Sequence, residues 1–108
     1  MAFDIAELRK LVALDENDPL SRFALGQALF REDSVESLNE AAEHLIFANT
    51  TAPEHLATYH ILGQVLIRLE RIDEARSVLT AGCEEVGGIG EGMGRDLGPA
   101  MAELLRGL

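Results

Sequence analysis

Two short motifs occur twice in this chain at nearly the same spacing. The segment LGQAL at 25–29 returns as LGQVL at 62–66, an offset of 37 residues. An Ala-x-x-x-Leu pair that begins at Ala41 returns at Ala75, an offset of 34 residues. The difference of three residues places an insertion between the two motifs of the first copy. Repeats of this length, each built from a pair of helices, are typical of helical solenoids.

Helical periodicity extends along nearly the whole chain. Apolar residues recur at spacings of three and four, and no segment alternates strictly between apolar and polar residues. Six helices are therefore expected, at Asp4–Leu14, Pro19–Arg31, Ser37–Thr50, Glu54–Leu69, Asp73–Val86 and Asp96–Gly107. They would form an all-α fold, a short right-handed α-solenoid of about three antiparallel helix pairs.

Two local features of the first helices can also be predicted. The second helix is expected to begin at an Asp18 N-cap followed by Pro19 as its first residue. One face of the first helix is expected to hold Ile5, Leu8, Leu11 and Val12.

Glycine inside each repeated motif is costly for a helix and needs a structural reason. An interior glycine costs about 1 kcal/mol relative to alanine. Gly26 and Gly63 would leave room for a close approach of the second helix of each pair, where Ala41 and Ala75 are also small. Tight packing of the facing side chains can offset the lost helix propensity. Replacement of Gly63 by leucine is therefore expected to destabilise the fold by overpacking.

These residues resemble the tetratricopeptide repeat (TPR) family, whose pattern is aromatic-x-x-Leu-Gly-x-x-Tyr, then Ala-x-x-x-Phe, then Pro. The matching positions are Leu25, Gly26, Ala41, Leu45 and Pro53 in the first copy and Tyr59, Leu62, Gly63, Ala75 and Leu79 in the second. Departures from the pattern are Arg22 for the aromatic residue, Leu29 and Leu66 for tyrosine, and Gly87 for the second proline.

The resemblance implies a single domain over 1–108. Its parts would be a degenerate N-terminal helix at 1–16, two repeats at 19–52 and 53–86, a glycine-rich linker at 87–94 and a C-terminal capping helix at 95–108. The linker sequence, GGIGEGMG, holds five glycines in eight residues. It lacks the Gly-Lys-Ser/Thr ending of a phosphate-binding loop and follows a helix instead of a strand.

In TPR arrays the first helices of successive pairs line a concave groove that binds extended or helical peptides. The resemblance therefore implies a non-catalytic protein–protein interaction module that binds a peptide or a partner helix. Carried over residue by residue, it assigns the groove to Phe23, Gln27, Phe30, Arg31, His60, Gln64, Ile67 and Arg68. Amide and guanidinium groups recur at equivalent positions in the two repeats, and they can hydrogen-bond the backbone or the carboxylates of a bound chain.

Alternatives to this groove stay open. Phe23 and Phe30 could pack on the first helix, and Arg31 and Arg68 could be ordinary solvated side chains on an acidic surface. The Lys and Asn clamp by which TPR domains hold chaperone tails is replaced here by residues such as Phe23 and His60, so a more apolar ligand is expected. Self-association as a homodimer through the surface that bears the phenylalanines is the alternative function.

Charge and composition limit the classes of partner and compartment. Nineteen acidic and nine basic residues give a net charge of −10, which repels phosphate backbones, so no nucleic-acid partner is expected. The chain has one cysteine and therefore no internal disulfide. The start MAFDIAELRK does not match a signal peptide, and no stretch approaches the roughly 18 apolar residues of a membrane span. We expect a cytoplasmic protein without a membrane partner.

The residues that could support catalysis or bind a metal do not form a complete set. Glu40 and His44 are spaced i, i+4 on one helix, but no cysteine completes a ligand set, and His60 is expected on a different helix face. His55, also near in sequence, does not change this. Cys83 is expected to be a small buried hydrophobe. No enzyme activity, metal or cofactor is therefore expected.

Overall fold

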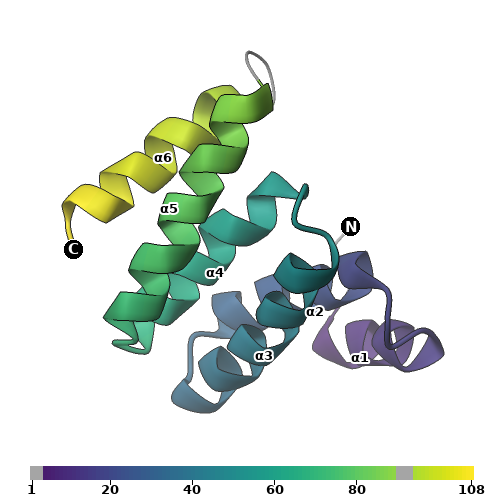
Figure 1. The fold of residues 1–108 in the computed structure, drawn as a ribbon. Coiled ribbons are helices and arrows are strands. Elements are labelled where there is room, and N and C mark those ends of the chain that lie inside the picture. Colours follow the sequence, from purple (N-terminus) through teal and green to yellow (C-terminus); the bar gives the residue numbers. More distant parts are fainter. Residues whose placement is uncertain (1–3, 90–93) are drawn as a thin grey trace. The chain divides into compact units, whose positions relative to one another are not determined.

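The computed structural model describes residues 4–89 and 94–108, and every regular element in these two ranges is an α-helix. The helices are α1 (Ile5–Leu14), α2 (Pro19–Glu32), α3 (Val35–Thr51), α4 (Leu56–Arg68), α5 (Ile72–Ile89) and α6 (Gly94–Arg106) (Figure 1). The predicted all-α class is confirmed. The chain divides into two compact units, Met1–Pro53 with α1 to α3 and Glu54–Leu108 with α4 to α6.

Side-chain caps determine where the helices of the first unit begin. Asp18 caps α2 as predicted, because its carboxylate accepts a hydrogen bond from the backbone N–H of Leu20 at 3.2 Å. α3 begins at Val35, earlier than the predicted Ser37, because Ser34 is its N-cap and accepts a hydrogen bond from the Ser37 N–H at 3.0 Å. In both helices a short side chain satisfies an N–H group that has no partner within the helix.

α5 is longer than its predicted range. It continues to Ile89 and does not end at Val86, so the first residues of the predicted linker are helical. The end of α5 is held by α6, because a Cβ atom at Gly98 of α6 would lie 3.0 Å from Val86 Cγ1. The central part of the predicted linker, 90–93, lies outside the described residues.

In the first unit, Gly26 gives α3 a close approach to α2. A Cβ atom at Gly26 would lie 2.6 Å from Leu45 Cγ, well inside the 3.5–4.0 Å at which carbon atoms pack best. Leu45 and Ala41 are fully buried. α2 also packs against α1, so it is the central contact helix of this unit.

The second unit repeats this contact and adds a further one. A Cβ atom at Gly63 of α4 would lie 2.7 Å from Leu79 Cγ of α5. Gly82, also on α5, is enclosed on two sides, because a Cβ atom there would lie 2.6 Å from Met101 Sδ of α6 and 2.7 Å from Tyr59 Cβ of α4. Tyr59, Leu79 and Met101 form the buried cluster of this unit. The glycines of α4 and α5 thus let three helices share one core.

The same unusual turn occurs once in each unit. Asp33, which ends α2, has a φ of 59°, and Glu70, which follows α4, has a φ of 60°. These two acidic residues are 37 residues apart, the same offset as the LGQ motifs. The left-handed conformation after a helix is usually occupied by glycine, because a Cβ atom is strained there. The repeat therefore extends beyond the motifs to the backbone of the turn.

Only part of the apolar face of α1 is buried. Leu8 and Val12 are buried, but Leu11 is 37% exposed and Leu14 is 82% exposed. Each residue of a helix is rotated by about 100° from the one before it, which places Leu11 about 100° from Val12. Among the described helices, α2 alone has its backbone close to α1, and one such neighbour cannot cover that width. Leu11 therefore lies at the partly exposed edge of the apolar face expected from the sequence.

Candidate binding surfaces and a polar network

The four residues predicted to bind a partner in the first repeat all lie on α2. Phe23, Gln27 and Phe30 are half-buried, and Arg31 is exposed near the end of the helix. Spacings of three, four and seven residues place them on one side of α2. Gly26, which faces α3, is three residues from Phe23 and four from Phe30, so this side of α2 borders the contact with α3.

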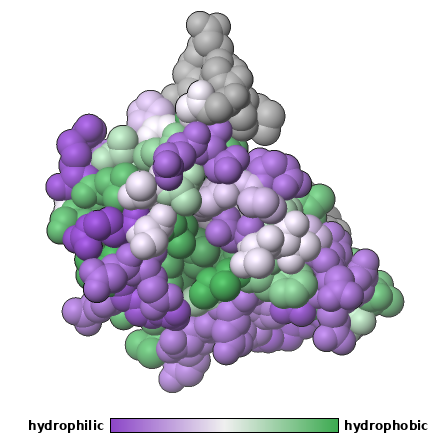
Figure 2. Space-filling model, in the orientation of Figure 1, coloured by the Kyte–Doolittle hydropathy of each residue, from purple (hydrophilic) through white to green (hydrophobic). Residues whose placement is uncertain are grey.

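Leu20 belongs to the same side of α2, and the sequence analysis did not include it. It precedes Phe23 by three residues and Gln27 by seven, so the three side chains lie along one stripe. Its side chain is 57% exposed, which is unusual for a large apolar residue in the first turn of a helix that packs on two others. On the face drawn in Figure 2, apolar surface is visible between the hydrophilic residues. The helical spacing alone was enough to find Leu20.

The corresponding residues of the second repeat lie on α4. His60, Gln64 and Ile67 are half-buried, and Arg68 is exposed. The Gln64 amide nitrogen lies 2.9 Å from His60 Nε2. Burial lowers the pKa of His60 below its ordinary value, which favours the neutral ring. A neutral Nε2 without a proton can accept the hydrogen bond that the amide donates.

Ile67 has a role inside the second unit. It packs against the buried cluster of Tyr59, Leu79 and Met101, together with apolar residues of α5 and α6. Part of its apolar surface is therefore used by the fold itself, so a contact with a partner would involve only the remaining part.

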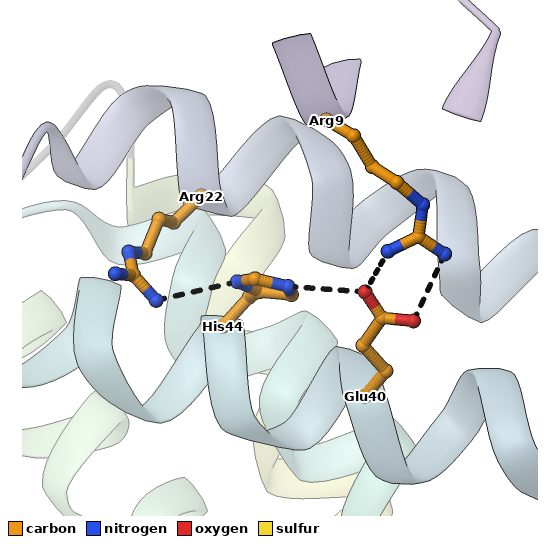
Figure 3. A network of polar contacts seen from close by, with 4 residues as sticks. All are labelled: Arg9, Arg22, Glu40 and His44. Atoms are coloured by element: carbon orange, nitrogen blue, oxygen red, sulfur yellow. Dashed lines mark hydrogen bonds and ion pairs between the residues drawn. The ribbon is translucent and has the colours of Figure 1, made fainter. Parts of the chain in front are cut away.

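A chain of four polar side chains links the three helices of the first unit (Figure 3). Arg9 of α1 donates two hydrogen bonds to the Glu40 carboxylate of α3, one of them at 3.0 Å. The other end of the chain is Arg22 of α2, whose Nη1 lies 3.4 Å from Nδ1 of His44. His44 Nε2 lies 3.3 Å from Glu40 Oε2.

The direction of these hydrogen bonds determines the tautomer of His44. Arginine can only donate, so His44 Nδ1 accepts from Arg22 and carries no proton. The ring proton is then on Nε2, which donates to Glu40. The hydrogen bonds from Arg9 are the main reason why the pKa of Glu40 lies below its ordinary value, so this carboxylate is ionised at neutral pH.

Arg22 occupies the position where the TPR pattern has an aromatic residue. Its guanidinium carbon lies 4.1 Å from the ring centroid of Phe47 on α3, and its Nε donates to the backbone oxygen of Glu16 at 2.7 Å. A guanidinium group is flat and stacks well on aromatic rings, so it can replace a ring at this position. The equivalent residue of the second unit, Tyr59, is buried. The substitution is evident from the repeat pattern, whereas its contact with Phe47 depends on the packing of α2 on α3.

The network borders an open cavity of about 350 Å³. The cavity is lined by Arg9, Val12, Ala13, Glu16, Arg22, Leu25, Glu40 and His44. It therefore combines charged groups from α1, α2 and α3 with an aliphatic floor. Neither the cavity nor the network was predicted, because residues that are far apart in the sequence have to meet to form them.

The residues considered for metal binding serve other purposes. Glu40 and His44 belong to the polar network, and His55 Nδ1 lies 2.8 Å from the Thr58 hydroxyl. Within 4–89 and 94–108, no group of three or more His, Cys, Asp or Glu side chains is placed to hold a metal ion. Cys83 is a half-buried free thiol that packs against the cluster around Met101. No helix in the described ranges is both long and apolar enough to cross a bilayer.

The comparison with known families agrees with the repeats. The model of the family described as "Anaphase-promoting complex, cyclosome, subunit 3" matches residues 5–82, which is most of the chain and includes both Gly–Leu contacts. No curated protein matches the sequence. The family is generally non-catalytic, and its repeats are of the TPR type, as the sequence analysis expects. The chain therefore belongs to the anaphase-promoting complex, cyclosome, subunit 3 family and is a TPR-like helical repeat of the protein-interaction kind.

Proposed function

We propose that this chain binds an extended or helical segment of a partner protein, and that one side of α2 in the first unit and, taken separately, one side of α4 in the second unit each offer a contact surface. The observation that carries this proposal is the match of residues 5–82 to a family named for a subunit of a multi-protein complex. Such a subunit must contact other proteins. We propose further which side chains make the contact and what kind of segment they fit.

Equivalent side chains in the two repeats support a regular pattern of contacts. Gln27 and Gln64 are 37 residues apart, and Arg31 and Arg68 share the same offset. A bound backbone presents N–H and C=O groups at a regular spacing, and amide side chains can both donate to and accept from it. The exposed guanidinium of Arg31 suits a carboxylate of the partner.

Apolar contacts would supply much of the affinity. On α2 the stripe of Leu20, Phe23 and Phe30 offers large apolar side chains, and on α4 the accessible part of Ile67 offers another. The net charge of −10 favours a segment that is neutral or basic. The neutral pair of His60 and Gln64 adds no positive charge that would oppose this preference.

The test has two stages. Affinity capture from a lysate of the source cells, followed by mass spectrometry, identifies a partner, and its contact segment is then made as a synthetic peptide for calorimetry. Arg31→Ala and Gln64→Ala should each weaken binding of that peptide by about tenfold, the loss of one charge-assisted or well-placed hydrogen bond. Arg76→Ala on α5 is the matched control, because it removes an exposed arginine elsewhere.

Two results would reject the proposal. If folded Arg31→Ala and Gln64→Ala proteins bind the peptide as tightly as the unchanged chain, these sides of α2 and α4 do not bind it. If sedimentation instead shows a concentration-dependent dimer that both substitutions disrupt, the surface serves self-association.

A further inference from the structure

Two charged groups that border the cavity between α1, α2 and α3 form no ion pair with a residue that the structure describes. Arg9 and Glu40 neutralise each other, and the His44 ring bridges Glu40 and Arg22. Neither Arg22 nor Glu16 forms an ion pair with any of the residues that the structure describes. A guanidinium group and a carboxylate therefore border the same cavity, and neither is in an ion pair with another described residue.

The guanidinium of Arg22 makes three contacts within the protein and still has donors to offer. One N–H binds the backbone oxygen of Glu16 and another binds His44, while the plane of the group stacks on Phe47. Arginine carries five N–H donors, so three of them remain for a ligand. A group that is already ordered loses little further entropy when a carboxylate binds.

The remaining walls are aliphatic. Val12 and Leu25 are buried and form the floor, and Ala13 adds a small apolar side chain. A cavity of about 350 Å³ is at the lower end of the range for small-molecule sites, about 300–1,000 Å³. It suits a ligand the size of a single amino acid and leaves room for water.

We propose that this cavity binds a free α-amino acid with an aliphatic side chain. The carboxylate of the ligand would bind the unused N–H groups of Arg22, and its ammonium group would bind the Glu16 carboxylate. The side chain would contact Val12 and Leu25. A zwitterion is the ligand that neutralises both unpaired groups at once, whereas a simple anion would be repelled by Glu16 and a simple cation by Arg22. The site is independent of the partner-binding surface proposed above.

The probe is leucine, titrated into the 15N-labelled full chain and followed by NMR, with calorimetry for affinity. Three analogues each lack one feature: 4-methylpentanoate has no amine, 3-methylbutylamine has no carboxylate, and glycine has no side chain. We expect saturable shifts at residues 9–25 and 40–44 with leucine, and binding at least about tenfold weaker for each analogue.

Substitutions separate the two charged contacts. Glu16→Gln keeps the size of an exposed side chain and should weaken leucine binding at least about tenfold, while leaving 4-methylpentanoate binding unchanged or tighter. Glu43→Gln, an exposed carboxylate of α3 outside the cavity lining, is the control and should change nothing. Arg22→Gln should abolish binding, but it also removes the stack on Phe47, so the Glu16 variant is decisive.

Several outcomes would overturn the proposal. One is the absence of saturable shifts with leucine up to about 10 mM in a folded protein, a concentration at which a site of even 1 mM affinity would be nearly full. Equal binding of leucine and 4-methylpentanoate would show that Glu16 does not contribute. Shifts confined to residues outside the cavity would place any binding elsewhere.

Discussion

Gly63→Ala tests the close contact between a helical glycine and a buried leucine of the next helix, a contact that occurs in each repeat. The added Cβ atom would lie 2.7 Å from Leu79 Cγ and 3.2 Å from its Cδ1. Carbon atoms pack best at 3.5–4.0 Å, so the two side chains must separate by about 1 Å. Leu79 is fully buried, so any movement of its side chain shifts the neighbouring core groups. The strain must therefore be taken up by a shift of α5 relative to α4.

The expected free-energy change is a balance of two effects. Overpacking of a core costs about 1–3 kcal/mol. Replacing an interior helical glycine by alanine returns about 1 kcal/mol. We therefore expect Gly63→Ala to lower the free energy of unfolding by about 1 kcal/mol, and by up to about 2 kcal/mol if α5 cannot shift.

Urea denaturation followed by circular dichroism measures the free energy of unfolding, and it is compared with one control variant and with one altered background. Gly87→Ala is the control, because it is also in α5 but its added Cβ atom would meet nothing within 4 Å; it should stabilise by about 1 kcal/mol. In a Leu79→Ala background the clash is gone, and Gly63→Ala should stabilise there by a similar amount. The reasoning is refuted if Gly63→Ala stabilises the unchanged protein as much as Gly87→Ala does, or has the same effect in both backgrounds.

Three further predictions concern other contacts of the two units. Glu70→Gly should raise the free energy of unfolding by about 0.5–1 kcal/mol, because glycine tolerates a φ of 60° without strain; Glu70→Ala should give no such gain in the same urea experiment. Arg9→Met should destabilise by less than about 1 kcal/mol at pH 7, since the Arg9 side chain is half exposed. The pKa of Glu40 is lowered in the folded state, so the stability that the Arg9–Glu40 pair contributes is complete above the ordinary pKa of 4.5 and is lost as pH falls through the lower folded pKa. If the stability difference between the unchanged protein and Arg9→Met grew on acidification, that result would contradict this prediction. Gly82→Ala should destabilise by up to about 2 kcal/mol, because the overpacking against Met101 exceeds the gain in helix propensity, and faster proteolysis of α6 would accompany it; unchanged stability would show that α6 is not held there.

The sequence was sufficient to predict the helices and their repeat, because the information for both is local. Apolar spacing of three and four defines each helix, and the LGQ motif marks equivalent positions without knowledge of the contact. The sequence also predicted that each glycine faces the second helix of its pair. The structure identifies the contacting residue as Leu45 for Gly26 and Leu79 for Gly63.

Features that depend on which neighbours a helix has could not be predicted in the same way. Leu11 fits the apolar periodicity of α1 but is partly exposed, because α2 is too narrow to cover it. The glycines after Val86 indicated a linker, yet α5 continues through Gly87 because its end packs on α6. The amino-acid composition of a segment indicates its intrinsic preference for helix or loop, and tertiary contacts can override that preference.

The polar network and cavity required contacts between residues up to about 30 positions apart. Glu40 and His44 attracted attention through their spacing, but their partners Arg9 and Arg22 lie on other helices. Long side chains can point in several directions from the same backbone, so the sequence cannot choose among such pairs. The partner-binding residues on α2 and α4 stay a prediction that the binding experiments must test.

The central structural claim is that each repeat is built on a glycine in direct contact with a buried leucine of the following helix. An isotope-edited NOE spectrum of the full chain measures this directly. We expect strong NOEs between the Hα atoms of Gly26 and the methyl groups of Leu45, and between those of Gly63 and the methyl groups of Leu79. The absence of either set from a well-folded protein would contradict the account.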